Sequence, residues 1–333
     1  MRQGIPNMIR KAIVFILILV IPALFITPAF ASTTRALEGK VIILDAGHGS
    51  DTTNYYRGYC EHTTMLSLAH KIKPLLEERG ATVHLTRPSS EGVLLSTRIA
   101  MSNIWSLEAI KQSRILNIDN EGSLIASINE IDRLISVMQN VITDPETYAS
   151  IYFNTPFSPT EPIHPDLLKI FRLQSDPVIG ENFLFISLHS NATGRPINTA
   201  VHGADVFHAS NQIRNLRDYY KNYSYVHQNE HFGNIILDYI HDVGIQRRKV
   251  DHANFFVIRE HNIPAVLVEN GHHTNSRDRE NLINDFFLER LAYAYLDAIT
   301  DYFADLPLPR PQTKYTNPIL FGPEWFVPYL TMS

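Results

Sequence analysis

Four side chains of the sequence are suited to binding a metal ion and moving a proton. They are His48, Glu61, His189 and Glu269. Two imidazoles and one carboxylate form the ligand set of a catalytic zinc ion that keeps one position open for water. A further carboxylate near that water can accept its proton while the water attacks a carbonyl carbon. These residue types therefore indicate metal-assisted hydrolysis, provided that the fold brings them together.

Three of these residues follow short apolar runs that we expect to be buried strands. His48 lies just after the run VIIL, His189 follows NFLFISL, and Glu269 follows AVLV. Parallel strands of an open α/β sheet bring their carboxyl ends to one side, where ligands bind. Taken alone, His48 could equally be a surface residue of a turn. The partners at the other strand ends favour a metal site.

The order of the predicted elements indicates an α/β domain. A helix begins at about Glu61 and ends before Gly80, and a second strand follows at 82–86, so the chain starts with a β-α-β unit. The remaining predicted elements of the domain are a helix that starts over 93–101, strands at 203–208 and 255–258, a helix at 231–243 and a closing helix or helix pair over 278–303. We therefore expect a three-layer α/β fold with a mostly parallel, twisted sheet flanked by helices.

Residues 103–180 have a different pattern, which we interpret as a helical insertion in this domain. Apolar residues recur at helical spacing over 123–142, and a shorter helical segment covers 105–118. Two helices joined by a short turn suggest an antiparallel hairpin. The segment 145–165 is rich in proline and aromatic residues, which indicates irregular structure, and a short helix is expected at 166–173.

The first 31 residues have the layout of a secretory signal peptide. Arg10 and Lys11 precede a long apolar run, and a small-x-small cleavage site ends at Ala31. An uncleaved membrane anchor is the alternative, but the run is short for a span and Pro22 interrupts it. We therefore expect an exported protein, in the periplasm or the extracellular cell wall, with no stable membrane association after the signal is removed.

Composition excludes several classes of partner and site. The 29 Lys and Arg residues against 34 Asp and Glu residues give a formal net charge of -5, which offers no electrostatic basis for binding nucleic acid. Cys60 is the only cysteine, so the chain can form neither an intramolecular disulfide nor a thiolate-rich metal site. After the signal we expect one catalytic domain over 32–305 and a proline- and aromatic-rich tail over 306–333.

Five segments occur in an order that carries a family resemblance. They are DAGHG at 45–49, Glu61 at a helix start, LTR at 85–87, SLHSNA at 187–192 and IPAVLVENGHHTN at 263–275. Together they resemble the zinc-dependent N-acetylmuramoyl-L-alanine amidases of bacterial cell-wall remodelling. The resemblance implies that His48, Glu61 and His189 bind one zinc ion and that Glu269 is the catalytic base. It also implies a substrate, the amide between N-acetylmuramic acid and the L-Ala of peptidoglycan stem peptides.

Residues beside these motifs are secondary candidates. Asp45 could hydrogen-bond a ligand histidine and so orient it. Asn191 and Arg259 could line the site or hold substrate, or serve only in capping and surface pairing. His62 is the substitute ligand if the helix start is aligned one residue further on.

Two other functions stay open on the sequence alone: an exported zinc peptidase that acts on another amide, and a cell-wall-binding protein without catalysis. The insertion also raises the question of regulation. Its apolar stripe could lie over the zinc site, dock an activator protein, or simply pack on the domain. The sequence does not decide among these three arrangements, and it gives no stem-peptide preference.

Overall fold

The structure is a computed structural model that describes residues 35–50, 55–116, 121–157, 159–221 and 223–307. The predicted signal segment over 1–31 and the tail beyond residue 307 lie outside these residues. Within the described ranges, none of the helices combines the length and the apolar character that crossing a membrane requires.

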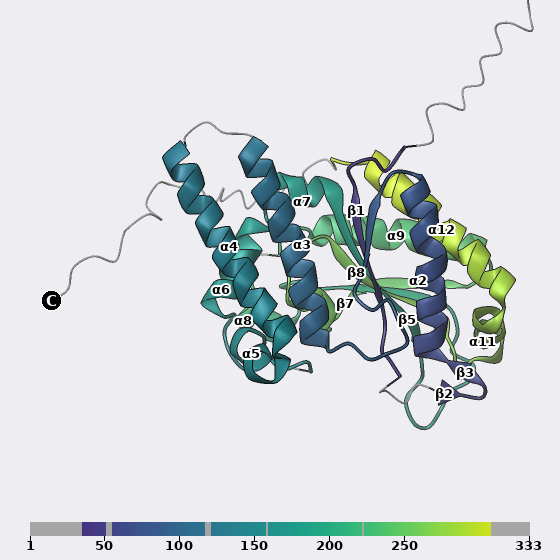
Figure 1. The fold of residues 1–333 in the computed structure, drawn as a ribbon. Helices are drawn as coiled ribbons and strands as arrows, with labels where there is room; N and C mark the ends of the chain where they lie inside the picture. The colour runs from purple at the N-terminus through teal and green to yellow at the C-terminus, as the bar shows by residue number, and fades with distance from the viewer. Residues whose placement is uncertain (1–34, 51–54, 117–120, 158, 222, 308–333) are drawn as a thin grey trace, which may run out of the picture.

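The central sheet lies between two sets of helices (Figure 1). Its six strands have the spatial order β4-β1-β5-β8-β6-β7. They are β1 (Val41–Ala46), β4 (Thr82–Leu85), β5 (Phe183–Asn191), β6 (Ala204–His208), β7 (Arg247–His252) and β8 (Ala265–His272). Strands β4, β1, β5 and β8 are parallel, whereas β6 is antiparallel to β8 and β7 is parallel to β6. The carboxyl ends of β1, β5 and β8 therefore share one end of the sheet, and those of β6 and β7 lie at the opposite end.

One face of the sheet is covered by helices that follow the regular α/β order. They are α2 (Glu61–Glu78), α9 (Val226–Asp242), α11 (Ser276–Ile283) and α12 (Asp285–Ala304). Because side chains alternate along a strand, every second residue of each strand points to this face. Ile42, Leu184 and Val266 are fully buried in the core that these strands share with the helices.

The opposite face carries a second core. Its helices are α3 (Leu95–Leu116), α4 (Glu121–Thr143), α6 (Pro165–Leu173), α7 (Pro177–Asn182), α8 (Arg214–Tyr219) and α10 (Phe256–Arg259). Ile43, Phe185 and Leu267 are buried on this side of the sheet. Helices on both faces of a mostly parallel sheet make three layers (Figure 1), so the predicted fold class is confirmed.

The predicted amphipathic hairpin is formed by α3 and α4, which lie side by side (Figure 1). The apolar stripe of α4 belongs to the second core, where Ile131, Ile135 and Met138 are buried. The apolar stripe therefore packs on the domain itself, which is the third of the arrangements considered from the sequence. Helix α3 is continuous, so the predicted elements at 93–101 and 105–118 are one helix.

One local prediction on the sheet was wrong, and one strand was missed. In the run at 255–258, predicted as a strand, residues 256–258 belong to the short helix α10, whose residues are all buried, and Phe255 precedes the helix. Short apolar runs do not distinguish a buried strand from a buried helical turn. The strand β7 was missed because its sequence RRKVDH is charged. As the outermost strand, with one neighbour in the sheet, it has no need of an apolar run.

The segment 145–165 is less irregular than its composition predicted. It opens with α5 (Pro145–Tyr152), where the Asp144 side chain accepts a hydrogen bond from the Thr147 N–H at 3.1 Å and proline occupies the first turn. Both features favour a helix start. After α5 the chain turns, and the Asn154 side-chain oxygen accepts hydrogen bonds from the N–H groups of Thr160 and Glu161, each at 3.0 Å.

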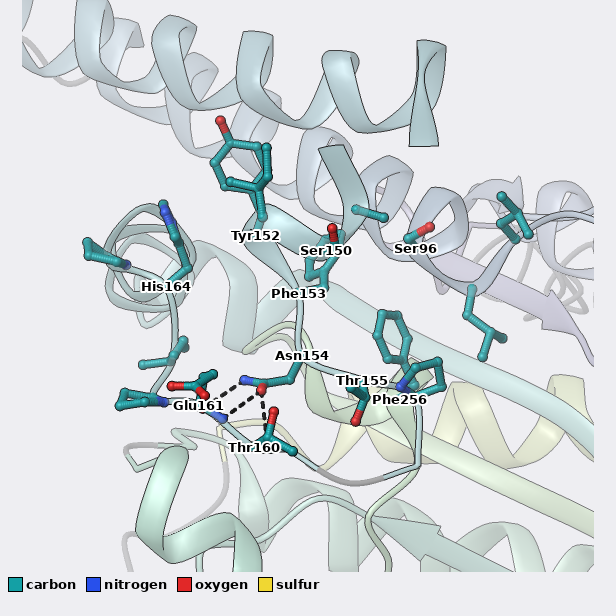
Figure 2. A pocket seen from close by; sticks show the side chains of 18 residues that line it. Ser96, Ser150, Tyr152, Phe153, Asn154, Thr155, Thr160, Glu161, His164 and Phe256 are labelled. Atoms are coloured by element: carbon teal, nitrogen blue, oxygen red, sulfur yellow. Dashed lines mark hydrogen bonds between the residues drawn. The ribbon is translucent and has the colours of Figure 1, made fainter. Parts of the chain in front are cut away.

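A pocket of about 840 Å³ lies where this segment meets α3 and α10. Figure 2 shows Tyr152, Phe153, His164 and Phe256 around it. None of the four side chains singled out from the sequence lines this pocket. The chemistry that they offer lies instead at the carboxyl ends of β1, β5 and β8.

Candidate metal centre

The carboxylate of Glu61 lies between the two candidate histidines. Its Oε1 is 3.2 Å from Nε2 of His48 and 3.0 Å from Nδ1 of His189, and it accepts a hydrogen bond from the Ser190 N–H at 3.0 Å. One potential ligand atom of each of the three side chains lies within 4.8 Å of the other two. A tetrahedral zinc ion with bonds of about 2.0–2.1 Å holds its ligand atoms about 3.4 Å apart. The donor set and its spacing therefore fit a divalent ion of this kind.

A tight hairpin delivers Glu61 to this position. Strands β2 (Tyr55–Tyr56) and β3 (Tyr59–Cys60) pair antiparallel, and the residues between them, Arg57 and Gly58, have φ angles of 46° and 82°. Two positive φ angles are the mark of a type I′ turn, which joins strands closely. Glu61 then opens α2 and is buried. The substitute candidate His62 turns its Nδ1 to the Cys60 sulfur at 3.3 Å, outside the cluster.

The backbone at Gly47 fits against the ring of His189. The Gly47 N–H donates to the Leu188 carbonyl at 2.9 Å, and a Cβ atom at residue 47 would lie 2.4 Å from Cε1 of His189. The imidazole thus occupies the space that any side chain at 47 would need. His48 follows in the left-handed conformation, with φ of 59°, and its ring lies 4.8 Å from that of His189 at an interplanar angle of 75°.

Glu269 completes the group from β8, directly opposite His189 in the parallel register. Its Oε2 is shielded from solvent and has no hydrogen-bond partner among the residues that the structure describes. Burial raises the pKa of the Glu269 carboxyl well above its ordinary value, and the nearby carboxylates of Glu61 and Asp205 raise it further. This carboxyl is therefore suited to holding a proton.

The pKa of Glu61 moves in the opposite direction. Burial alone would raise it, but hydrogen bonds from His189 and His48 hold it well below its ordinary value, so the group is ionised. Two carboxyls with pKa values driven apart by their surroundings are the usual pairing of an anionic group with a proton-transfer group. The surroundings thus distinguish the two carboxyls: Glu61 is suited to binding a cation, and Glu269 is suited to holding a proton.

Asp45 has a structural task, and the expectation that it hydrogen-bonds a ligand histidine was wrong. Its fully buried carboxylate accepts hydrogen bonds from the Thr86 hydroxyl at 2.5 Å, the Ser187 hydroxyl at 2.6 Å and the Arg98 guanidinium at 3.0 Å. Burial acts to raise the pKa of Asp45, but Arg98 and the two hydroxyls outweigh it, so the pKa is lowered. Asp45 is therefore an ionised anchor beneath the site.

Two buried arginines fix the backbone that carries His48, and sequence reasoning missed their role. Arg98 of α3 donates to the Ala46 carbonyl at 2.9 Å and also to the His48 carbonyl. Arg87 donates to the carbonyls of Ala46 at 3.0 Å and Gly47 at 3.1 Å. The available signal was the position of Arg87 at the end of the LTR motif, directly after a strand.

The two other candidates have different outcomes. Asn191 ends β5 and is half-buried, with its carbonyl accepting a hydrogen bond from the His273 N–H at 2.9 Å, and a substrate role for its side chain stays a prediction. Arg259 is fully buried, 2.7 Å from Glu260, and donates to the Thr155 carbonyl at 2.6 Å. A substrate role for Arg259 was therefore wrong, because no substrate can reach a guanidinium enclosed under the insertion.

A family comparison agrees with this geometry. The model of the N-acetylmuramoyl-L-alanine amidase family matches residues 42–110 and 179–301, which is more than half of the chain. The chain belongs to the N-acetylmuramoyl-L-alanine amidase family. The resemblance carried by the sequence motifs is thereby confirmed. The two matched segments contain all four residues of the candidate centre, and the residues between them fall within the predicted insertion.

Individual relatives are more distant. A probable cell wall amidase of Staphylococcus saprophyticus, LytH, is 38% identical over 68 residues, an alignment that spans 19% of this chain and 23% of that protein. The amidase Ami1 of Mycobacterium smegmatis has 13% identity and a TM-score of 0.50, covering 81% of this chain and 99% of that one. The catalytic domain of the amidase CwlV from Bacillus (Paenibacillus) polymyxa has 21% identity and a TM-score of 0.47, over 80% and 98% of the two chains. The likeness to Ami1 shows a shared fold.

Proposed function

We propose that this chain hydrolyses the amide bond between N-acetylmuramic acid and the L-Ala of peptidoglycan stem peptides. One observation carries the proposal: His48, Glu61 and His189 meet at one carboxylate oxygen, with Glu269 across from His189. Membership of the amidase family supplies the class of bond. The geometry supports both parts that hydrolysis would require, a set of metal-ligand candidates and a separate carboxyl for proton transfer.

His48, Glu61 and His189 would hold a single zinc ion, because imidazole nitrogen and carboxylate oxygen are ligands that zinc accepts in a three-ligand catalytic site. Zinc bound there would lower the pKa of a water molecule and polarise the scissile carbonyl. The rest of the arrangement serves to hold the ligands in place. The Ser190 N–H orients the Glu61 carboxylate, and the arginines behind residues 46–48 fix the backbone of His48.

Glu269 would act first as a base and then as an acid. In its ionised form it accepts a proton from the water that adds to the carbonyl carbon. The C–N bond breaks as the same proton passes from Glu269 to the leaving amine nitrogen of L-Ala. The raised pKa of Glu269 favours this second transfer. A carboxyl with a raised pKa holds its proton more tightly, so it is still protonated when the amine departs.

The test is digestion of purified sacculi by the full chain, followed by analysis of the released products. Wild type is expected to release stem peptides with a free L-Ala amino terminus. Glu269→Gln keeps the size of the side chain but cannot accept the proton, so the rate should fall by at least about 100-fold. Glu280→Gln, an exposed position on α11, is the matched control and should keep wild-type activity.

Three results would overturn the proposal. Release by Glu269→Gln at the wild-type rate would remove the assigned base. Equal cleavage of peptides that lack muramic acid would favour a zinc peptidase acting on another amide. A folded protein that binds sacculi without releasing any peptide would instead indicate a cell-wall-binding protein without catalysis.

We infer that residues 1–31 direct export and that the catalytic domain over 32–305, with its insertion over 103–180, acts in the periplasm or the cell wall. The layout of the amino terminus supports this. Cell fractionation followed by immunoblotting tests export, and protein retained in the cytoplasm would contradict it.

An activator protein would dock where the two hairpin helices approach residues 117–120. Two apolar side chains are exposed there, Leu116 on α3 and Ile125 on α4.

A further inference from the structure

A second group of metal-ligand residues lies at the opposite end of the sheet, and we refer to it as the His208 cluster. It consists of His208 at the end of β6, His252 at the end of β7 and Glu230 on α9. One potential ligand atom of each side chain lies within 4.8 Å of the other two. Asp205 of β6 pairs with Glu269, and His208 lies three residues, or about 10 Å, further along the strand, away from the carboxyl ends of β1, β5 and β8.

His208 presents an unsatisfied nitrogen in the protein interior. The side chain is fully buried, and its Nδ1 lies 3.0 Å from the Ala209 carbonyl oxygen. A carbonyl oxygen only accepts hydrogen bonds, so Nδ1 carries the proton and Nε2 keeps its lone pair. Among the described residues, no hydrogen-bond partner reaches Nε2. A backbone carbonyl on one ring nitrogen and a free lone pair on the other is the arrangement of metal-ligating histidines.

His252 adds a second ring nitrogen without a hydrogen-bond partner within the described stretches of the chain, from the neighbouring strand. It stands directly across from His208 in the parallel register of β6 and β7. Its Nδ1 is also shielded from solvent, without a hydrogen-bond partner in the described part of the chain. The two rings lie 4.7 Å apart at an interplanar angle of 82°, close to the 4.8 Å and 75° of His48 and His189. The two histidine pairs therefore share one geometry.

Glu230 supplies the carboxylate. Its Oε1 is 3.8 Å from Nε2 of His208, and its side chain is 43% exposed, so it can move the remaining distance at little cost. Burial lowers the pKa of His208, which keeps the imidazole in the neutral form that binds metals. Two imidazole nitrogens with one carboxylate oxygen suit zinc and similar transition metals, whereas calcium and magnesium prefer oxygen ligands alone.

We propose that His208, Glu230 and His252 form a second binding site, for a divalent transition metal such as zinc, that fastens the outer strand β7 to β6 and α9. Strand β7 has one neighbour in the sheet and is at most partly buried along its length. It therefore gains little from apolar burial. A metal bridge from its last residue to a buried strand and a helix stabilises this side of the sheet and lies apart from the hydrolytic chemistry.

The experiment measures the zinc content of the purified full chain by elemental mass spectrometry. The protein is first dialysed against buffer with zinc and then against metal-free buffer. Wild type is expected to hold two zinc ions per chain. His252→Ala and Glu230→Gln should each hold one, and both should hydrolyse sacculi within about twofold of wild type. His241→Ala, an exposed histidine on the same helix, should hold two. His48→Ala should also hold one zinc, and it should lose activity.

The outcomes separate this proposal from the proposed hydrolysis, because the metal count is read whether or not the chain cleaves peptidoglycan. One zinc in wild type, retained in both Glu230→Gln and His252→Ala, would overturn the second site and leave the first intact. Glu230→Gln is the decisive variant, since the substitution is isosteric at a half-exposed position and should fold. A second readout is the melting temperature, which zinc should raise more in wild type than in Glu230→Gln.

Discussion

Gly47 sets how closely the backbone before His48 approaches the ring of His189. The glycine is needed for space and not for an unusual backbone angle, since its φ lies outside the left-handed region that the structure assigns to His48. The ring packs on a surface without a side chain, and the Gly47 N–H bonds to the strand that carries His189. At this point one absent methyl group determines where a metal-ligand candidate can lie.

The substitution Gly47→Ala is expected to displace the His189 ring while leaving the fold in place. A Cβ atom 2.4 Å from the imidazole cannot be accommodated without moving one of the two. We expect sacculus hydrolysis to fall by at least about 100-fold, because a shift of about 1 Å in a catalytic group can cost that much. Product release from sacculi measures the loss, and circular dichroism checks the fold.

Gly194→Ala is the matched control, since no atom lies within 4 Å of a Cβ built there. It should keep full activity. A Gly47→Ala protein as active as wild type would show that the His189 ring can take another position and still serve the reaction.

At the scale of elements, the sequence predicted those whose pattern is set locally. Strands β1, β5 and β8 are apolar runs, and α2 has an apolar stripe ended by Gly80. The site could be predicted for the same reason, because His48, His189 and Glu269 stand at the ends of these strands. What failed depends on neighbours that are distant in sequence. The charged residues of β7 are tolerated because this strand lies at an edge of the sheet. Arg259 is buried because it bonds to a loop about 100 residues earlier in the chain.

The insertion shows the same limit, because the stripe of α4 predicts a buried face but not the surface that buries it. In the structure that surface is the second core, so shortening a stripe residue should destabilise the domain. Ile131→Ala is expected to lower the free energy of unfolding by about 3 kcal/mol, since Ile131 is fully buried. Ile125→Ala, 53% exposed on the same helix, should change it by less than about 0.5 kcal/mol.

Chemical denaturation of both variants measures the difference. A rise in sacculus hydrolysis by Ile131→Ala, with the free energy of unfolding unchanged, would contradict the role of the α4 stripe as part of the second core. Such a result would mean that the hairpin restrains the site rather than completing the core.

For the whole molecule, Asp45 is a junction between layers. Its carboxylate joins β1 to Ser187 of β5, to Thr86 after β4 and to Arg98 of α3. The two cores lie on opposite faces of the sheet. The buried ion pair between Asp45 and Arg98 links the sheet to helix α3 of the second core. Its loss should therefore weaken the global fold as well as the candidate centre.

Asp45→Asn should lower the free energy of unfolding at pH 7 by about 3 kcal/mol, because it leaves the buried Arg98 charge without its counter-ion. The pKa of Asp45 is lowered from 3.8 in the folded state, so the stability it contributes is present above that value and is lost as the pH falls below it. The gap between wild type and Asp45→Asn should accordingly narrow in acid. Denaturation curves at pH 7, 5, 3.5 and 2.5 measure this.

Asp132→Asn breaks a surface pair with Lys111 and should cost less than about 1 kcal/mol at every pH. An Asp45→Asn protein as stable as this control would mean that Arg98 is satisfied by the backbone carbonyls alone.

The candidate centre is assembled from residues that lie far apart in the chain. His48 and Glu61 leave the ribosome early, whereas Glu269 lies on β8, which in the sheet lies between β5 and β6 and follows both in sequence. If Glu269 has the proton-transfer role that we propose, the group that completes the centre is also among the last to be translated. A chain truncated before β8 would then lack hydrolytic activity even with all three metal-ligand candidates present, so the order of the strands would delay that activity until the domain is complete.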